Sequence, residues 1–161
     1  MTPIKNASMG TVLLLEALEH IREPQKVIDE IYRILIPGGY CVATTLMTFE
    51  IHRCPYDYWR FCPDGLCYLF RAFHRHELIL EHHKALPRGI WTVCQKPLTF
   101  EDNTDKQPIV RVSESGTSWV KNIIKRILNK AGYDLIQVPK DTELMYVVGV
   151  HTENGWSSSL K

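Results

Sequence analysis

The sequence lacks a long hydrophobic run, an excess of one charge and a regular cysteine pattern. Its longest apolar run, residues 12–15, ends at Glu16 and is far shorter than the roughly 20 residues that cross a bilayer. Nineteen Lys and Arg are balanced by eighteen Asp and Glu, so bulk charge attracts neither nucleic acid nor an anionic membrane. The five cysteines are irregularly spaced, and the first residues do not resemble a secretory leader. We therefore expect a cytoplasmic protein with no membrane or nucleic-acid partner.

The size and apolar content of the chain predict one compact unit. Its 161 residues are 45% hydrophobic, which is enough to bury a single core. The last residues, 154–161, are polar and have little to bury. We expect residues 1–153 to form one folded unit and residues 154–161 to form a flexible tail.

The first third of the chain predicts a strand, a helix and a second strand. Thr11 to Leu15 is a continuous apolar run, typical of a strand buried on both faces. Pro24 suits a first helical turn, apolar positions 27, 28, 31 and 35 form one stripe, and Pro37-Gly38-Gly39 ends that helix. Tyr40 to Thr45 is rich in β-compatible residues. Because a βαβ unit has parallel strands, a doubly wound α/β sheet is predicted.

The rest of the chain has weaker signals. Pro63 opens a helix with apolar residues at positions 66, 69, 70 and 73, and Leu78 to Leu80 favours a strand. Residues 87–118 mix Pro, Gly and charges without periodicity, which predicts an irregular connection or small insertion. An amphipathic helix over 119–131 and a last strand over 144–150 complete the pattern.

Two segments follow the predicted parallel strands, where open α/β sheets bind ligands. The first, residues 16–23, contains Glu19-His20, an acid and an imidazole that could act as a base or orient a polar ligand. The alternative is that the pair caps the next helix and satisfies itself, and the sequence leaves both open.

The second segment, residues 46–60, contains a cluster of polar and aromatic residues: His52, Asp57, Tyr58, Trp59 and Arg60. Aromatic rings flanked by an acid and a guanidinium can form a wall of a small-molecule pocket. The alternative is a packed loop in which Trp59 fills the core edge and Asp57 pairs with Arg60.

Histidines and cysteines are dense between residues 52 and 83, but no metal site is predicted. Structural zinc sites usually show paired ligands such as C-x₂₋₄-C, and although Cys62 and Cys67 have that spacing, Cys67 falls between the apolar positions of the predicted helix and is better explained as a core residue. The members are His52, Cys54, Cys62, Cys67, His74, His76, His82 and His83. The Gly-rich phosphate-binding motifs are also absent, so a nucleotide hydrolase is not indicated.

The order of motifs resembles type 11 class I S-adenosylmethionine (SAM) dependent methyltransferases. Leu18-Glu19-His20 follows an apolar strand, and a helix then leads into Pro37-Gly38-Gly39. The Asp57-Tyr58-Trp59-Arg60-Phe61 run, preceded by His52, resembles the loop seen in one branch of that family. The match covers roughly the first half of the chain.

The resemblance implies a partial Rossmann-like sheet that lacks its N-terminal strands. In the family, seven strands form a doubly wound sheet whose last strand is antiparallel and lies between the fifth and sixth. By that resemblance 11–15 and 40–45 are the fourth and fifth strands, and 78–80 and 144–150 are the sixth and seventh. The Gly-rich turn and the ribose-binding acid of the family have no counterpart here, so weak or no SAM binding is expected for this chain alone.

The resemblance also assigns roles to residues. Glu16, Glu19 and His20 would lie beside the cofactor. His52 and residues 57–60 (Asp57, Tyr58, Trp59 and Arg60) would form the side that binds a small-molecule methyl acceptor. His20 and His52 are the candidate bases, since a base is needed only where the acceptor loses a proton.

A non-catalytic interaction module is the alternative from another class of function. The predicted strand from Thr11 to Leu15 would lack its neighbour and expose an apolar edge. We expect such an edge to promote self-association.

Overall fold

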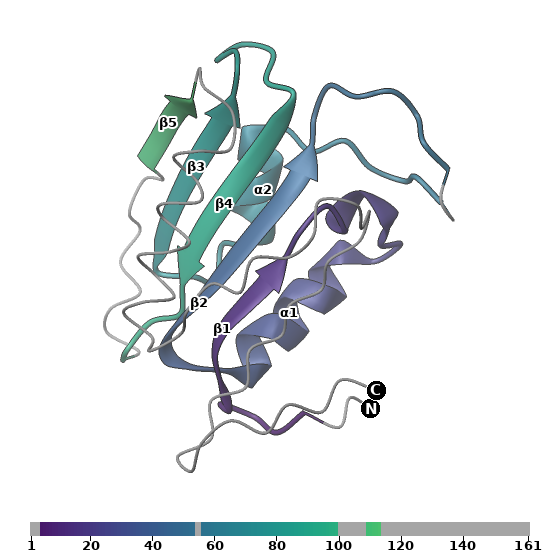
Figure 1. The fold of residues 1–161 in the computed structure, drawn as a ribbon. Coiled ribbons are helices and arrows are strands. Elements are labelled where there is room, and N and C mark those ends of the chain that lie inside the picture. Colours follow the sequence, from purple (N-terminus) through teal and green to yellow (C-terminus); the bar gives the residue numbers. More distant parts are fainter. Residues whose placement is uncertain (1–3, 54–55, 100–108, 114–161) are drawn as a thin grey trace, which may run out of the picture.

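The computed structural model describes residues 4–53, 56–99 and 109–113, and within them a five-stranded sheet. The strand order is β1-β2-β4-β3-β5 (Figure 1). The strands are β1 (Met9–Leu14), β2 (Leu35–Leu46), β3 (Arg75–Glu81), β4 (Gly89–Gln95) and β5 (Ile109–Ser113). The helices are the 3₁₀ helix η1 (Leu18–His20), α1 (Pro24–Ile34) and α2 (Pro63–Leu69).

The predicted βαβ unit is present, with β1 and β2 parallel and α1 between them in the chain. Pro24 occupies the first turn of α1, and the helix buries Ile28, Ile31 and Ile34. The predicted stripe ran one residue too far, because Leu35 is extended, fully buried and the first residue of β2. The helix thus ends before its expected terminator.

Pro37-Gly38-Gly39 lies within β2, where the pairing with β1 is irregular. Met9 pairs with Leu35, but Thr11 pairs with Tyr40. Gly38 has a φ of +76°, which glycine adopts without strain. A Cβ on Gly39 would lie 2.9 Å from one backbone carbonyl oxygen and 3.0 Å from another. The two glycines therefore allow β2 to bulge and then align with β1.

The expectation of an irregular connection over residues 87–118 was wrong. β4 and β5 both fall in that range, and β4 pairs antiparallel with β2 on one side and with β3 on the other. β4 thus occupies the place that the resemblance gave to the last strand of the sheet. Residues 119–131, 144–150 and 154–161, for which a helix, a strand and a tail were predicted, lie outside the described residues.

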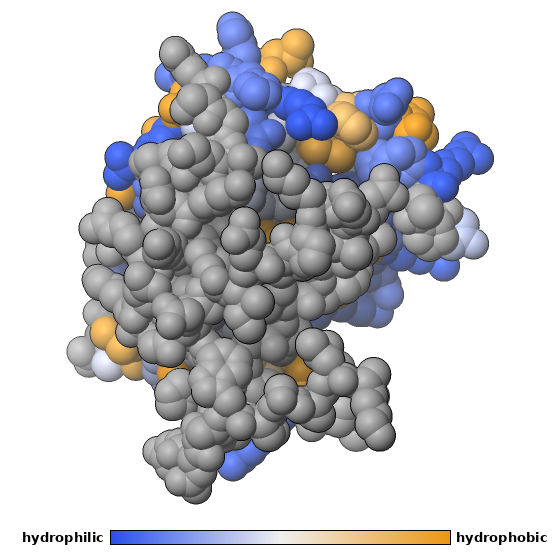
Figure 2. Space-filling view, in the orientation of Figure 1, coloured by the Kyte–Doolittle hydropathy of each residue, from blue (hydrophilic) through white to orange (hydrophobic). Residues whose placement is uncertain are grey.

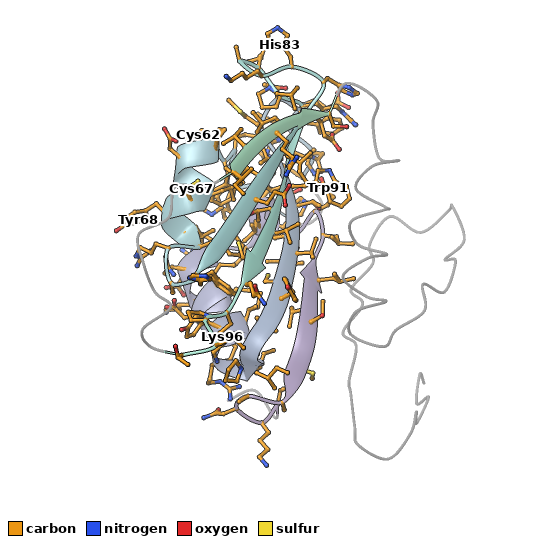
Figure 3. The ribbon with its side chains drawn as sticks, turned by 90° about the vertical axis from the view of Figure 1, so that its left-hand side faces the viewer. Cys62, Cys67, Tyr68, His83, Trp91 and Lys96 are labelled. Carbon is orange, nitrogen blue, oxygen red and sulfur yellow. The ribbon has the colours of Figure 1, made fainter. Side chains whose placement is uncertain are left out.

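Both helices pack on the same face of the sheet (Figure 3). The main core joins α1 and α2 to alternate residues of the strands, such as Cys41 and Ala43 of β2. The intervening residues, among them Val42 and Ile79, form a second cluster on the other face, where Trp91 also lies. The predicted helix from Pro63 ends at Leu69, and none of the helices in the described ranges is long and apolar enough to span a membrane. The described residues thus form a mixed five-stranded sheet with helices on one face, which fits part of the predicted doubly wound sheet.

Candidate functional site

The loops that follow β1 and β2 leave the sheet at the same edge because the two strands are parallel (Figure 1). Glu16 begins the first loop with a φ of +46°, in the left-handed region. Its amide donates to the hydroxyl oxygen of Thr44 at 2.8 Å and lies 3.2 Å from the carbonyl oxygen of that residue. The end of β2 therefore fixes the sharp turn that ends β1.

Glu19 in η1 is a fully buried acid at this edge. Its Oε2 accepts a hydrogen bond from the Thr45 hydroxyl at 2.9 Å, and Thr45 is itself buried. Its Oε1 is buried without a hydrogen-bond partner among the described residues. An unsatisfied buried polar group costs about 1–3 kcal/mol, so this oxygen marks a place where a ligand would be stabilising.

The loop after β2 folds back onto η1. The amides of Tyr58 and Trp59 both point to the carbonyl oxygen of Glu19, at 2.8 and 3.3 Å. The indole of Trp59 donates to the carbonyl oxygen of Ile21 at 2.9 Å. Residues 38 or more positions apart in sequence are thereby brought to one site.

His20 and His52 meet edge to face, with ring centroids 4.9 Å apart and planes at 89°. Nδ1 of His20 contacts the carbonyl oxygen of Tyr56, and Nδ1 of His52 lies 3.2 Å from that of Glu50. Because a carbonyl oxygen only accepts, each Nδ1 carries the hydrogen, which leaves the Nε2 lone pair free in the neutral ring. One candidate ligand atom from each histidine and one from Glu19 lie within 4.8 Å of one another.

An ion pair holds the second loop in shape. The Asp57 side chain is 2% exposed and accepts two hydrogen bonds from Arg60, at 2.5 and 2.7 Å. It also accepts one from the His52 amide at 2.9 Å. The Arg60 guanidinium, followed by the His52 amide and charge, outweighs burial and holds the pKa of Asp57 well below its usual range. Arg60 in turn donates to the carbonyl oxygen of Glu50, so the loop is closed at both ends.

Glu16 has a different environment from the neighbouring acids. The residue is exposed, but surrounding protein atoms displace water from its carboxyl group, and this desolvation raises its pKa. The Thr44 hydroxyl opposes the shift, whereas the charge of Glu19 reinforces it. A cationic ligand group at this edge would be favoured by both carboxylates.

The structure decides between several of the local alternatives. The Glu19 carboxylate bonds to Thr45, and α1 has Glu23 at its N-cap with no side-chain cap bond, so Glu19-His20 does not cap the helix. The Asp57–Arg60 pair of the packed-loop alternative is present. Tyr58 and Trp59 are each 43% exposed, so neither fills the core edge.

The sequence reasoning overlooked Thr44 and Thr45. Both are buried at the end of β2 and bind the first loop. Two adjacent hydroxyl residues at the end of an apolar strand were the available signal. The surface over these loops mixes hydrophobic and hydrophilic residues in the upper right of Figure 2.

Known proteins resemble part of this chain in sequence. Residues 1–43 match the family described as methyltransferase domain. Ubiquinone biosynthesis O-methyltransferases from Psychrobacter cryohalolentis and Psychrobacter arcticus are each 36% identical to the chain over 64 residues, which is 40% of the chain and 23% of each relative. The match thus spans less than a quarter of the length of these relatives.

Two solved structures share the fold at low sequence identity. A SAM-dependent methyltransferase from Methanosarcina mazei is 14% identical with a TM-score of 0.50, over 62% of this chain and 64% of that one. A SAM-dependent methyltransferase from Thermotoga maritima, described as a possible histamine N-methyltransferase, is 18% identical with a TM-score of 0.50, over 60% and 59%. Residues 1–43 thus match a methyltransferase domain, and the described sheet shares the Rossmann-like fold of these two structures.

Proposed function

We propose that the chain is part of a SAM-dependent methyltransferase that acts on a small molecule, and that it contributes the acceptor side and the residues beside the donor methyl group. The observation that carries this proposal is the meeting of Glu19, His20 and His52 where β1 and β2 end. A fully buried carboxylate there adjoins two partly exposed imidazoles. Such a site can both fix a ligand and take up a proton. The fold likeness supports the reaction type and leaves the acceptor to be identified.

The acidic residues of the first loop fit the cationic end of SAM. SAM supplies an electrophilic methyl group on a positively charged sulfur. Glu16 and Glu19 place two carboxyl groups at this edge, one of them with an unpartnered buried oxygen. With His20, they would hold the donor end of the cofactor, while the Gly-rich turn and ribose-binding acid of the family would have to come from outside the described residues.

The second loop would bind the acceptor. Tyr58 and Trp59 expose part of their rings beside His52, which suits an apolar or aromatic small molecule. Asp57 and Arg60 position the backbone of His52. The free Nε2 of His20 or His52 would accept the proton when the acceptor is a hydroxyl, the group that the names of the curated relatives indicate for those proteins. The non-catalytic alternative has no comparable support.

Self-association through β1 is a further part of this proposal. Among the described residues β1 pairs with β2 alone, so its other edge has no strand partner there. Light scattering of the purified chain tests it. A dimer that the Val12→Lys variant disrupts supports pairing at this edge, and a monodisperse monomer contradicts it.

The catalytic roles are tested by tritium transfer from [methyl-³H]SAM to a panel of small phenols and amines. The measurement uses the chain extended by any upstream residues that its gene encodes. His20→Gln or His52→Gln should lower kcat by about 100-fold or more if that residue is the base. The matched control is His83→Gln, because His83 lies in the exposed loop between β3 and β4 (Figure 3). If the rate of methyl transfer in both variants stays within twofold of the rate of the parent chain, neither histidine is the base.

A further inference from the structure

We propose that Glu19, His20 and His52 bind a divalent transition-metal ion of the zinc class. The inference rests on the proposed function and revises one role in it: an imidazole whose Nε2 binds the ion cannot also take up a proton, so the ion would instead lower the pKa of a hydroxyl acceptor. Metal binding can be measured without methyl transfer. It changes the expectation from the sequence, which predicted no metal site. The residues come from two loops, and only their meeting in the fold reveals the set.

The three side chains supply a suitable donor set at a suitable separation. Two imidazole nitrogens and one carboxylate oxygen lie within 4.8 Å of one another. Zinc ligands at roughly 2.0–2.2 Å in a tetrahedral arrangement are separated by about 3.3–3.6 Å. The ligand atoms would therefore have to come closer together by about 1 Å, which rotation of the partly exposed imidazoles can provide. Nitrogen donors favour zinc, cobalt or iron over magnesium or calcium.

The outer contacts of the ligands already have the arrangement that metal-binding histidines need. Such a histidine usually donates its other N–H to a carbonyl or carboxylate, which orients the ring. His20 does so through Nδ1 to Tyr56, and His52 through Nδ1 to Glu50. Nδ1 of His52 also lies 3.4 Å from an oxygen of Asp57. With Nδ1 donating in each ring, Nε2 is the nitrogen that remains to bind an ion.

Glu19 provides an independent indication of a ligand. It is fully buried, Thr45 holds its Oε2, and its Oε1 has no partner among the described residues. The Glu19 carboxylate is thus oriented by one oxygen and unsatisfied at the other. Coordination to a cation would satisfy that oxygen and offset the cost of burying it.

The site would be open on one side. The His52 side chain is 33% exposed, and the three residues leave a tetrahedral ion with a fourth position. Catalytic zinc sites keep such a position, and two histidines with one glutamate are a known ligand set. A small-molecule acceptor bound against the second loop would lie on this side.

The test is a titration of the full chain with Co²⁺, whose visible d–d absorption reports its coordination. One equivalent should bind with the intense bands of a four- or five-coordinate ion, and Zn²⁺ should displace it. Glu19→Gln, which retains an acceptor for Thr45, and His20→Gln and His52→Gln should each weaken binding by about tenfold or more. His83→Gln and Cys62→Ala serve as controls and should bind as the parent chain does.

Circular dichroism of each variant shows whether it is folded, and His52→Gln is the most informative because the residue is partly exposed. No saturable binding, or binding that persists in the folded His52→Gln and His20→Gln variants, would overturn the metal site. The metal and cofactor proposals fail separately. Cobalt binding by a chain that binds no SAM even when extended upstream would contradict only the cofactor, and SAM binding by the extended chain without cobalt binding would contradict only the metal.

Discussion

The Asp57→Ala substitution should loosen the second loop and expose the amides of Tyr58 and Trp59, which point to the carbonyl oxygen of Glu19. Asp57 accepts three hydrogen bonds and is almost fully buried. A hydrogen bond to a charged group contributes about 1.5–3 kcal/mol, but the partly exposed Arg60 regains water and retains its carbonyl partners. We therefore expect a net loss of about 2–3 kcal/mol in the free energy that holds the loop on η1.

The assay combines urea unfolding with amide hydrogen exchange at Tyr58 and Trp59, whose N–H groups point to Glu19. A loss of 2–3 kcal/mol corresponds to exchange about 30- to 150-fold faster, since about 1.4 kcal/mol is a factor of ten. Lys26→Ala is the control, because it removes an exposed pair with the same spacing and should cost less than about 1 kcal/mol. If Asp57→Ala leaves both amides as protected as in the control, the ion pair does not hold the loop.

Three further predictions concern the sheet. In urea titrations, Gly39→Ala should lower the free energy of unfolding by about 2 kcal/mol, because its Cβ would lie 2.9 Å from a carbonyl oxygen. Gly10→Ala is the control: its Cβ would have open space, so the free energy of unfolding should change by less than about 0.5 kcal/mol. Burial raises the pKa of Cys41 to about 12 from 9.0. The stability that comes from burying its neutral thiol is therefore complete below pH 9 and is lost as pH rises toward 12. In pH-dependent unfolding measurements, Cys41→Ala should flatten this dependence, whereas the substitution of the exposed Cys62 by Ala should not. Lys96→Met should lower the melting temperature, because the ammonium group donates at 2.7 Å to two carbonyl oxygens at the end of α1; an unchanged melting temperature would contradict that role.

The first part of the fold could be predicted because its signals are local. The apolar run at Thr11 to Leu15, the periodic stripe after Pro24 and the β-rich run at Tyr40 to Thr45 each specify one element. Their parallel pairing follows from the handedness and length of a βαβ unit. The end of α1 was misplaced because Leu35 is apolar, and apolar residues serve equally in a helix stripe and a buried strand.

β4 and β5 could not be predicted because their signals are short and surrounded by Pro, Gly and charge. Gly89 opens β4 directly after Pro87 and Arg88, and β4 forms because strands on both sides provide its hydrogen bonds. That stabilisation depends on contacts between distant segments and has no local pattern. The antiparallel position was therefore assigned to the wrong segment of the chain.

The candidate site, like the fold, was predictable from the sequence only in part. Topology alone indicated the two loops, and residue types indicated His20, His52 and Asp57. The edge-to-face contact of the histidines, the burial of Glu19 and its bond to Thr45 arise only when the second loop folds back on η1. Ligand spacing in the sequence did not indicate this set, because His52 lies 32 positions after His20.

Calorimetric titration with SAM tests the central claim most directly. It is performed on the 161-residue chain and on the same chain extended by any upstream residues that its gene encodes. We predict weak or no binding by the first and micromolar binding by the second, weakened about tenfold or more when Glu19 is changed to Ala. The absence of binding by both proteins would contradict the account of a methyltransferase site at the ends of β1 and β2.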